Sequence, residues 1–325
     1  MDIQRRQLLR LAGGAAALPV LSRAAWAQAY PTRPVKIYVG YSAGGGVDIT
    51  ARLIGAWLSE RMGQQFVVEN KTGAATNIAT EAMIRSAADG YTLLLTNAAN
   101  AINATYYDKL NFDFIKDTAP VSPIMSVPFV MVVQPNAPYK SVPELIAYAK
   151  ANPGKINCGT GGAGGPDHGS LELFKMLTGT NIVHVPYRGL APAVQDLLGG
   201  TIQLVFSTIP AAISHIKAGK LRSLAVTTRA RSSTMPDVPV VGDFVKGFES
   251  LQWYGLSAPK GTPAGVVAAL NKEVRAALTD AKIKARIATL GGDPMSMTPA
   301  EFGKFVNDET DKWAKVIKVA GAKAK

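Results

Sequence analysis

The sequence predicts an α/β protein with two lobes, and three observations lead to this prediction. The chain has 325 residues, which is more than one ordinary domain needs. Hydrophobic residues make up 47% and charged residues 18%, a composition that can form a sizeable core and excludes global disorder. Short apolar strand patterns alternate with amphipathic helical patterns along most of the chain, which is typical of sheets with helical crossovers.

The first predicted lobe begins with a βαβαβ order, which favours a parallel sheet. Asp48 precedes the first helical pattern and is a candidate N-cap. The predicted strands are 35–39, 66–68 and 91–96, and the predicted helices are 49–62 and 77–87.

The same alternation continues between two lobe crossings, which we place near residues 128 and 252. A late strand and two amphipathic helices then return to the first lobe, so we expect residues 28–127 plus 253–325 in lobe 1 and residues 128–252 in lobe 2. The predicted strands are 128–133, 155–158, 182–185, 202–207, 224–227 and 253–258, and the predicted helices are 141–151, 170–177, 191–198, 263–278 and 299–320.

Residues 1–27 have the features of a cleavable export signal. Arg5 and Arg6 precede an apolar stretch, and Ala25-Trp26-Ala27 matches an A-x-A cleavage site. The paired arginines resemble a twin-arginine (Tat) signal, and a Sec signal with two chance arginines is the alternative. We therefore expect a periplasmic protein, cleaved near Ala27.

Charge and metal-ligating residues exclude several classes of protein. The 35 Lys and Arg residues against 23 Asp and Glu give a net charge of +12, but without the basic run that marks a nucleic-acid arm. A single cysteine excludes a disulfide scaffold, and three widely spaced histidines disfavour a metal centre. The sequence thus predicts no cofactor, no metal and no nucleic-acid partner.

Two glycine-rich loops each follow a predicted strand and open a helix. We call residues 40–48 the first glycine loop and residues 159–169 the second glycine loop. Backbone N–H groups in such a loop, together with a helix N-terminus, favour an anion. Ligands of open α/β sheets lie beyond the carboxyl ends of strands, so two facing loops predict a clamp around a small anion. The alternative is that both loops are tight structural turns.

Two catalytic motifs match these loops literally. Residues 40–44 read G-x-S-x-G, which would make Ser42 a hydrolase nucleophile, but too little chain precedes it to provide an oxyanion loop. Residues 159–164 read G-x-G-x-x-G, but no acid follows at the end of the next strand to hold a ribose. Both enzyme interpretations are therefore disfavoured.

Several single residues keep two interpretations. Asp48 is a helix cap or a ligand contact, and His168 either faces the cleft or caps its helix. Arg188, in a third strand-end loop, either binds a carboxylate in a bidentate fork or pairs with a surface acid. Cys158 is expected to be a buried small residue.

The chain resembles the extracytoplasmic substrate-binding proteins of tripartite tricarboxylate transporters, also called the Bug family. The resemblance rests on stretches that occur in order across nearly the whole mature chain. They are GGGVDITARLI (44–54), VVENKTGAATNIA (67–79), ADGYTLLLTN (88–97), HVPYRGLAPAVQDLLGG (184–200), HIKAGKLRSLAVT (215–227), MPDVPVV (235–241) and WYGLSAPKGTP (253–263).

The resemblance implies a two-lobe periplasmic-binding-protein-like fold (type II-like) that closes on a small carboxylate. It also implies a monomeric, non-enzymatic receptor that delivers its ligand to two integral membrane transporter subunits. The implied ligand-binding residues are Tyr41, Ser42, Gly44, Gly45, Gly46, Val47 and Asp48 in the first loop, Thr160, Gly161, Gly162, Ala163, Gly164 and His168 in the second, and Asn77, Thr96, Asn97, Tyr187, Arg188 and Ser207 nearby.

The loops also depart from the family pattern. Val47 stands where the family has a hydroxyl residue, and the second loop is longer in glycine. The ligand therefore stays open between a dicarboxylate, a tricarboxylate, an amino acid and an aromatic acid. The rival functions are a secreted serine hydrolase that uses Ser42 and a ligand sensor without a role in transport.

Overall fold

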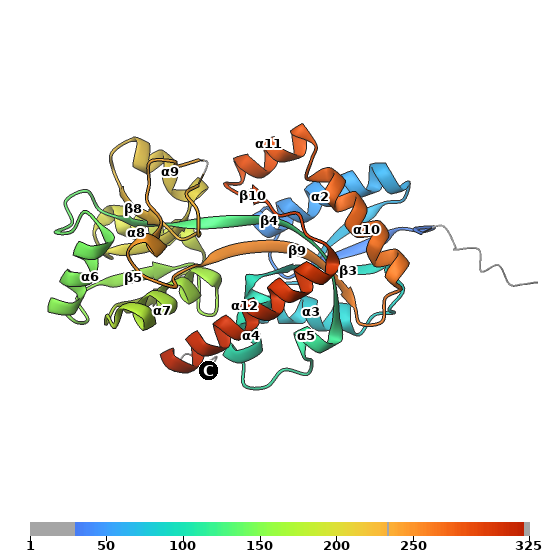
Figure 1. Ribbon diagram of the computed structural model, residues 1–325, viewed down its shortest axis with the longest axis horizontal. Helices are drawn as coiled ribbons and strands as arrows, with labels where there is room; N and C mark the ends of the chain where they lie inside the picture. The colour runs from blue at the N-terminus through green and yellow to red at the C-terminus, as the bar shows by residue number, and fades with distance from the viewer. Residues whose placement is uncertain (1–29, 233, 322–325) are drawn as a thin grey trace, which may run out of the picture.

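The computed structural model describes residues 30–232 and 234–321, and it has two lobes that share one mixed sheet (Figure 1). The predicted signal segment, residues 1–27, lies outside the described residues. Hydrogen-bonded neighbours in the sheet follow the order β2-β1-β3-β9-β4-β7-β5-β6, and β8 and β10 each pair with β4. The strands are β1 (Val35–Val39), β2 (Phe66–Asn70), β3 (Thr92–Asn97), β4 (Thr118–Val133), β5 (Asn157–Thr160), β6 (Val183–Pro186), β7 (Leu204–Thr208), β8 (Arg222–Val226), β9 (Leu251–Pro259) and β10 (Asp293–Pro294).

The helices fill the connections between these strands and cover both lobes (Figure 1). They are α2 (Gly46–Met62), α3 (Asn77–Ile84), α4 (Ala98–Tyr106), α5 (Phe114–Asp117), α6 (Val142–Ala151), α7 (Pro166–Thr178), α8 (Leu190–Gly199), α9 (Ile209–Lys217), α10 (Ala264–Ala277), α11 (Ala281–Thr289) and α12 (Pro299–Ala320), with short 3₁₀ turns at Ala74–Thr76 and Val241–Asp243. Of the described helices, none combines the length and apolar character that a membrane crossing needs.

Each lobe contains the parallel pairs expected from the alternating pattern. In the first lobe β1 lies between β2 and β3 and runs parallel to both. In the second lobe β5 lies between β6 and β7 and again runs parallel to both. The carboxyl ends of β1 and β5 therefore each lead into a glycine loop, the position where α/β sheets bind ligands.

Strand β4 connects the lobes, and it is longer than the sequence predicts. Its residues up to Pro128 pair with β9, and from Phe129 onward it pairs with β7 and β8. The register shifts near Pro120 and Pro123 accommodate prolines that cannot donate to the ladder. Only 128–133 was expected as a strand, because Pro120 and Pro123 mask the first part. The assignment of the two lobes to 28–127 plus 253–325 and to 128–252 stays a prediction.

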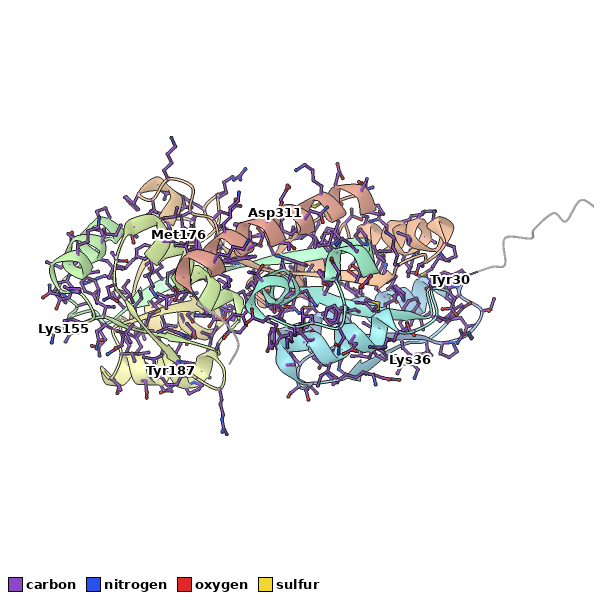
Figure 2. All side chains as sticks on the ribbon, turned by 90° about the horizontal axis from the view of Figure 1, so that it is seen from below. Tyr30, Lys36, Lys155, Met176, Tyr187 and Asp311 are labelled. Carbon is purple, nitrogen blue, oxygen red and sulfur yellow. The ribbon has the colours of Figure 1, made fainter. Side chains whose placement is uncertain are left out.

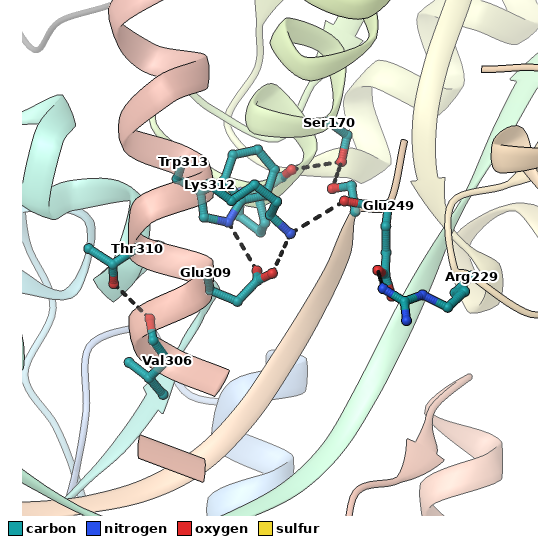
Figure 3. A network of polar contacts seen from close by, with 10 residues as sticks. Ser170, Arg229, Glu249, Val306, Glu309, Thr310, Lys312 and Trp313 are labelled. Carbon is teal, nitrogen blue, oxygen red and sulfur yellow. Dashed lines mark hydrogen bonds and ion pairs between the residues drawn. The ribbon is translucent and has the colours of Figure 1, made fainter. Parts of the chain in front are cut away.

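Helix α12 packs across both lobes, although the C-terminal segment was expected to return to the first lobe only. It contacts α4 in the first lobe and α7 in the second. Figure 3 shows its polar contacts: Lys312 Nζ donates to the Glu249 carbonyl (3.3 Å) and Trp313 Nε1 donates to Glu309 (3.1 Å). Nearby, Ser170 of α7 and Ser250 share a hydrogen bond of 2.6 Å.

Two predicted helix starts are wrong by three or four residues. The first helix begins at Gly46 with Gly45 as its N-cap, so Asp48 lies in the first turn and is not the cap. The helix expected from residue 170 begins at Pro166, with Gly165 as its N-cap. Glycine lowers helix propensity in an interior but is acceptable at an N-cap, and this explains both errors. Helices α4, α5, α9 and α11 were not predicted.

Candidate functional site

The two glycine loops have the same backbone conformation at an offset of 120 residues. The N-caps Gly45 and Gly165 have φ/ψ of −78°/166° and −75°/164°. Gly44 and Gly164 precede them with φ of +86° and +78°, a region that favours glycine. Each lobe thus presents a helix N-terminus at the end of a central strand.

The hydrogen bonds inside the two loops match as well. The N–H of Gly44 donates to Asp48 Oδ2 (2.9 Å), and the N–H of Gly164 donates to His168 Nδ1 (3.1 Å). Behind them, Thr50 Oγ1 donates to the Gly46 carbonyl, and Ser170 Oγ donates to the Pro166 carbonyl. Val47 and Asp167 therefore occupy equivalent positions, two residues after each N-cap.

Asp48 holds the first loop in shape. Its side chain is 2% exposed, and its two oxygens accept hydrogen bonds from Gly44, Arg52 and Asn70. Burial raises the pKa of Asp48, but these donors outweigh burial and hold the pKa below its usual value. Both carboxylate oxygens are thus occupied within the loop, which favours the structural interpretation of Asp48 over ligand contact.

The N-terminus of α2 offers backbone donors. The first intrahelical bond runs from the Ile49 N–H to the Gly45 carbonyl, so the N–H groups of Gly46, Val47 and Asp48 precede the helical ladder. Residues 42–46 are exposed. The hydroxyl of Tyr254 lies at this end, because a Cβ added at Gly46 would be 3.2 Å from it. Burial raises the pKa of Tyr254 to about 12, so this hydroxyl stays a neutral donor.

Asn97 brings a buried, unpartnered donor to the same place. It caps α4 by accepting from the Ala99 N–H (2.9 Å), and the Tyr41 hydroxyl donates to its Oδ1 at 3.5 Å. Its side chain is fully buried, and within the described residues its Nδ2 has no hydrogen-bond partner. Thr96, one residue earlier, donates to Asn100 inside the α4 cap. Asn97 also lies opposite Tyr254 in the β3–β9 pairing.

A strained segment lies beside these donors. Ala74, Ala75 and Thr76 all have left-handed φ values, which is unusual for three residues with side chains. Asn103 of α4 holds this segment by donating to the Ala75 carbonyl (2.6 Å) and to Asn77 Oδ1 (3.1 Å). Within the described residues the buried Asn77 Nδ2 has no partner. The lobe therefore carries two buried amide donors without a partner among the described residues, and a ligand or water molecule can supply one.

The second loop differs from the first because it contains its own carboxylate. Asp167 is 5% exposed, and its Oδ2 accepts a hydrogen bond from the Gly161 N–H. The N–H groups of Asp167 and His168 also stabilise this carboxylate, but burial outweighs them and raises its pKa to about 6. Pro166 has no N–H. The donors that are free on α2 are thus absent or occupied on α7.

The two loops face each other across the lobes. Burial raises the pKa of Tyr41 in the first loop. The charges of Tyr254 on β9 and of Asp167 in the second loop raise this pKa further. Tyr106 of α4 packs on the second loop, since a Cβ at Gly164 would lie 2.9 Å from its ring. The Tyr106 ring also meets the His168 ring edge-on, with 6.2 Å between centroids.

His168 is part of a stacked pair of histidines below the second loop. Its ring stacks on His184 at 4.0 Å between centroids, and His184 Nε2 shares a hydrogen bond of 2.6 Å with Thr160 Oγ1. Burial lowers the pKa of each histidine to about 4, so both are neutral near pH 7. His168 and Thr160 thus act within the protein, and they support the loop from below.

The other expected residues are spread over the second lobe. The Tyr187 hydroxyl donates to Asp196 (2.7 Å), on the lower side of the lobe in Figure 2. Arg188 and Ala163 are exposed, and the fully buried Ser207 donates to the Thr208 carbonyl (3.1 Å). Gly162 has a φ of +148° and Gly161 donates to Asp167, so both shape the loop. None of these contacts brings Tyr187, Arg188 or Ser207 to Tyr41 or Asn97.

The geometry gives Ser42 no catalytic partner among the described residues. Ser42 is exposed, whereas His168 in the second loop accepts from the Gly164 N–H and His184 on β6 shares a hydrogen bond with Thr160. His215 lies on α9. The buried Cys158 is free, and burial raises its pKa, so it is a poor nucleophile.

Three residues at the site were not singled out from the sequence. Tyr254 is part of a strand pattern, WYGLSA, in which nothing marks one aromatic side chain as facing a loop. Asn103 lies on a helix that was not predicted. Asp167 immediately precedes His168 in a glycine loop, and an acid in an anion-binding loop was the available signal.

Comparison with known proteins connects this geometry to a family. The family described as "Tripartite tricarboxylate transporter family receptor" (TctC) matches residues 50–322. The chain is 36% identical to BugT of Bordetella pertussis over 302 residues, which is 92% of this chain and 93% of BugT.

Solved structures agree with this match. Rpa4515 of R. palustris, solved with adipate, has a TM-score of 0.79 and 37% identity, covering 90% of this chain and 98% of its own. The periplasmic binding protein BugD has a TM-score of 0.76 and 33% identity, covering 91% and 100%. The match extends from α2 to the end of α12. The two-lobe fold and this match together show that the chain belongs to the tripartite tricarboxylate transporter receptor family, a family of solute-binding receptors.

Proposed function

We propose that this protein is a periplasmic receptor that captures a small carboxylate between the two glycine loops. The observation that carries this proposal is the set of free donors in the first lobe. The N–H groups at the start of α2 lie at the Tyr254 hydroxyl, and Tyr254 lies opposite Asn97 in the β3–β9 pairing. The Asn97 Nδ2 is unpartnered among the described residues. The adipate in the Rpa4515 structure supports an acid as ligand.

Capture needs no cation in the loops. Residues 40–48 and 159–169 contain no lysine or arginine. A hydrogen bond to a charged group contributes about 1.5–3 kcal/mol net, so three or four of them can sustain micromolar affinity after the costs of association. The α2 amides, Tyr254 and Asn97 provide that number.

Delivery completes the proposed function. The closed, monomeric receptor would dock on two integral membrane subunits of a tripartite transporter after export and cleavage near Ala27. We expect a strain without this protein to lose uptake of the acid that the protein binds. Normal uptake together with loss of a transcriptional response would instead indicate a sensor.

Replacement of Asn97 by aspartate tests the carboxylate site directly. Asn97→Asp keeps the size of the side chain and the α4 cap, since aspartate is an equally good N-cap. It replaces a free donor with a negative charge, so the affinity for the bound acid should fall at least tenfold. Isothermal titration calorimetry of the chain from Gln28, against a panel of small carboxylates, measures the effect.

Asn152→Asp is the matched control, because Asn152 ends α6 in the second lobe and bonds only locally to Tyr148. Its affinity should equal that of the wild type. If Asn97→Asp binds the acid as tightly as the wild type does, the first lobe is not the carboxylate site. Turnover of an ester by the wild type would instead favour the Ser42 hydrolase.

A further inference from the structure

We propose that Asp167 is a specificity-determining residue that selects ligands with a carboxylate at one end and a hydrogen-bond donor, an ammonium or hydroxyl group, at the other. This inference rests on the proposed function and specifies its ligand. The first lobe would hold the carboxylate, and the Asp167 carboxylate in the second lobe would accept the donor.

The argument begins with the equivalence of the two loops. Val47 and Asp167 occupy the same position in two copies of one backbone, and the N-caps differ by only a few degrees. At the first copy an apolar side chain leaves the helix N-terminus free for an external anion. At the second copy the chain places its own anion, so this helix N-terminus is already neutralised.

The second step is a comparison of the available donors. A second ligand carboxylate at α7 would need N–H groups there, but Pro166 has none, and Gly161, Asp167 and His168 already serve Asp167. It would instead meet a buried like charge. Two carboxylates that share a site strongly disfavour double ionisation.

The third step is the surroundings of Asp167. Tyr41 of the first loop and Cys158 of β5 lie within electrostatic reach of Asp167, and both are neutral near pH 7 because burial raises the pKa of each. On its own helix His168 is neutral, and Glu172 is paired with Lys175 at 2.8 Å. The 187–190 segment also packs on Gly161 beside Asp167, and its charged residue, Arg188, is exposed. Among these described groups no cation is paired with Asp167, so a ligand donor is its complement.

Room for the carboxylate is provided by a glycine. A Cβ at Gly165 would lie 2.7 Å from Asp167 Oδ1, and one at Gly161 would lie 3.3 Å from Oδ2. Tyr41, which is influenced by this carboxylate, also contacts Asn97, the proposed carboxylate donor. The Asp167 carboxylate and the Asn97 donor therefore lie in opposite lobes of the site.

The test uses matched acids of one chain length. The six-carbon series is adipate, 6-aminohexanoate, 6-hydroxyhexanoate and hexanoate, and the four-carbon series is succinate, 4-aminobutanoate, 4-hydroxybutanoate and butanoate. At pH 8 the amino or hydroxy acid should bind the wild type at least tenfold more tightly than the dicarboxylate of the same length. Calorimetry gives each dissociation constant.

Asp167→Asn removes the charge and keeps the shape. It should reduce the preference for the amino acid over the dicarboxylate at least tenfold. Between pH 8 and pH 5 the wild type should lose affinity for the amino acid as Asp167 is protonated, while the variant should not, since His168 and His184 stay neutral in this range.

The outcomes separate this inference from the proposed function. Tighter binding of the dicarboxylate by the wild type, or an unchanged preference in a folded Asp167→Asn, overturns the role of Asp167 and leaves carboxylate capture intact. If the variant does not fold, the wild-type series and its pH dependence still decide. Failure of every acid to bind overturns both proposals.

Discussion

The ionised Asp167 carboxylate destabilises the unliganded protein because it is buried without a paired cation. The same lack of a cation is what would let it select a ligand donor. Burial raises its pKa from 3.8 to about 6, so the folded protein binds this proton more tightly than the unfolded chain does. The stabilising contribution is therefore present below about pH 4 and is lost as the pH rises through 6. Above pH 6 the ionised carboxylate remains in a poorly solvated loop.

Removal of this charge should stabilise the protein at high pH only. The free energy of unfolding of Asp167→Asn, relative to that of the wild type, should be higher at pH 7.5 than at pH 4.5 by on the order of 1–3 kcal/mol. Urea unfolding of both proteins at pH 4.5 and at pH 7.5 measures this difference. The exposed Asp237→Asn should show a difference below about 0.5 kcal/mol at both. A gain that is equal at both pH values would contradict the ionisation argument.

Gly40 shows a second constraint at the scale of one residue. A Cβ there would lie 2.1 Å from Thr76 Oγ1 and 2.6 Å from Thr76 Cα, so the strained segment 74–76 packs directly on this glycine. Gly40→Ala must displace backbone and should cost about 1–3 kcal/mol in urea unfolding.

Gly265→Ala is the control for Gly40→Ala, because it lies in α10 with no atom within 4 Å of the added Cβ. It should gain up to about 1 kcal/mol through helix propensity. Equal effects of the two substitutions would mean that segment 74–76 moves freely.

Among the elements, helix α12 contacts both lobes without belonging to the sheet. Trp313 is fully buried, and a Cβ at Gly169 of α7 would lie 2.7 Å from its ring. Trp313→Ala should destabilise the protein by about 3–5 kcal/mol. Val319→Ala, on the same helix but 67% exposed, should change the free energy of unfolding by less than about 0.5 kcal/mol. Chemical unfolding compares the two variants. Similar losses of unfolding free energy would show that positions 313 and 319 of α12 do not differ in packing.

The elements also show how far sequence patterns reach. Apolar runs such as Val35–Val39 predict buried strands, because burial of their side chains decides the structure. The first half of β4 was missed because its prolines are tolerated only at register shifts that tertiary pairing creates. The first loop was expected between a strand and a helix, and it lies there, although the helix begins three residues earlier than predicted. Tyr254 was missed because its role depends on which loop lies against it, whereas Asp167 had a signal in the sequence, an acid in a loop of the anion-binding type.

At the scale of the whole molecule, β4 and β9 pass between the lobes, so a ligand that contacts both loops should stabilise both together. At 100 times Kd, a bound acid adds about 2.7 kcal/mol. For a protein of this size the thermal midpoint should rise by roughly 5–10 °C in one transition. Because its affinity is expected to fall at least tenfold, Asn97→Asp should show no more than about half of this rise at the same concentration. Two transitions, with only one shifted, would mean that the acid contacts a single lobe.

The 120-residue correspondence between the glycine loops has a consequence for how such receptors diversify. A single ancestral strand–loop–helix unit, duplicated once, would provide two loops with the same backbone conformation. The polarity of each loop then depends on two neighbouring positions, which are Gly46 and Val47 in the first loop and Pro166 and Asp167 in the second. A reciprocal exchange of these two pairs is therefore a design route to a receptor that accepts its ligand in reversed orientation.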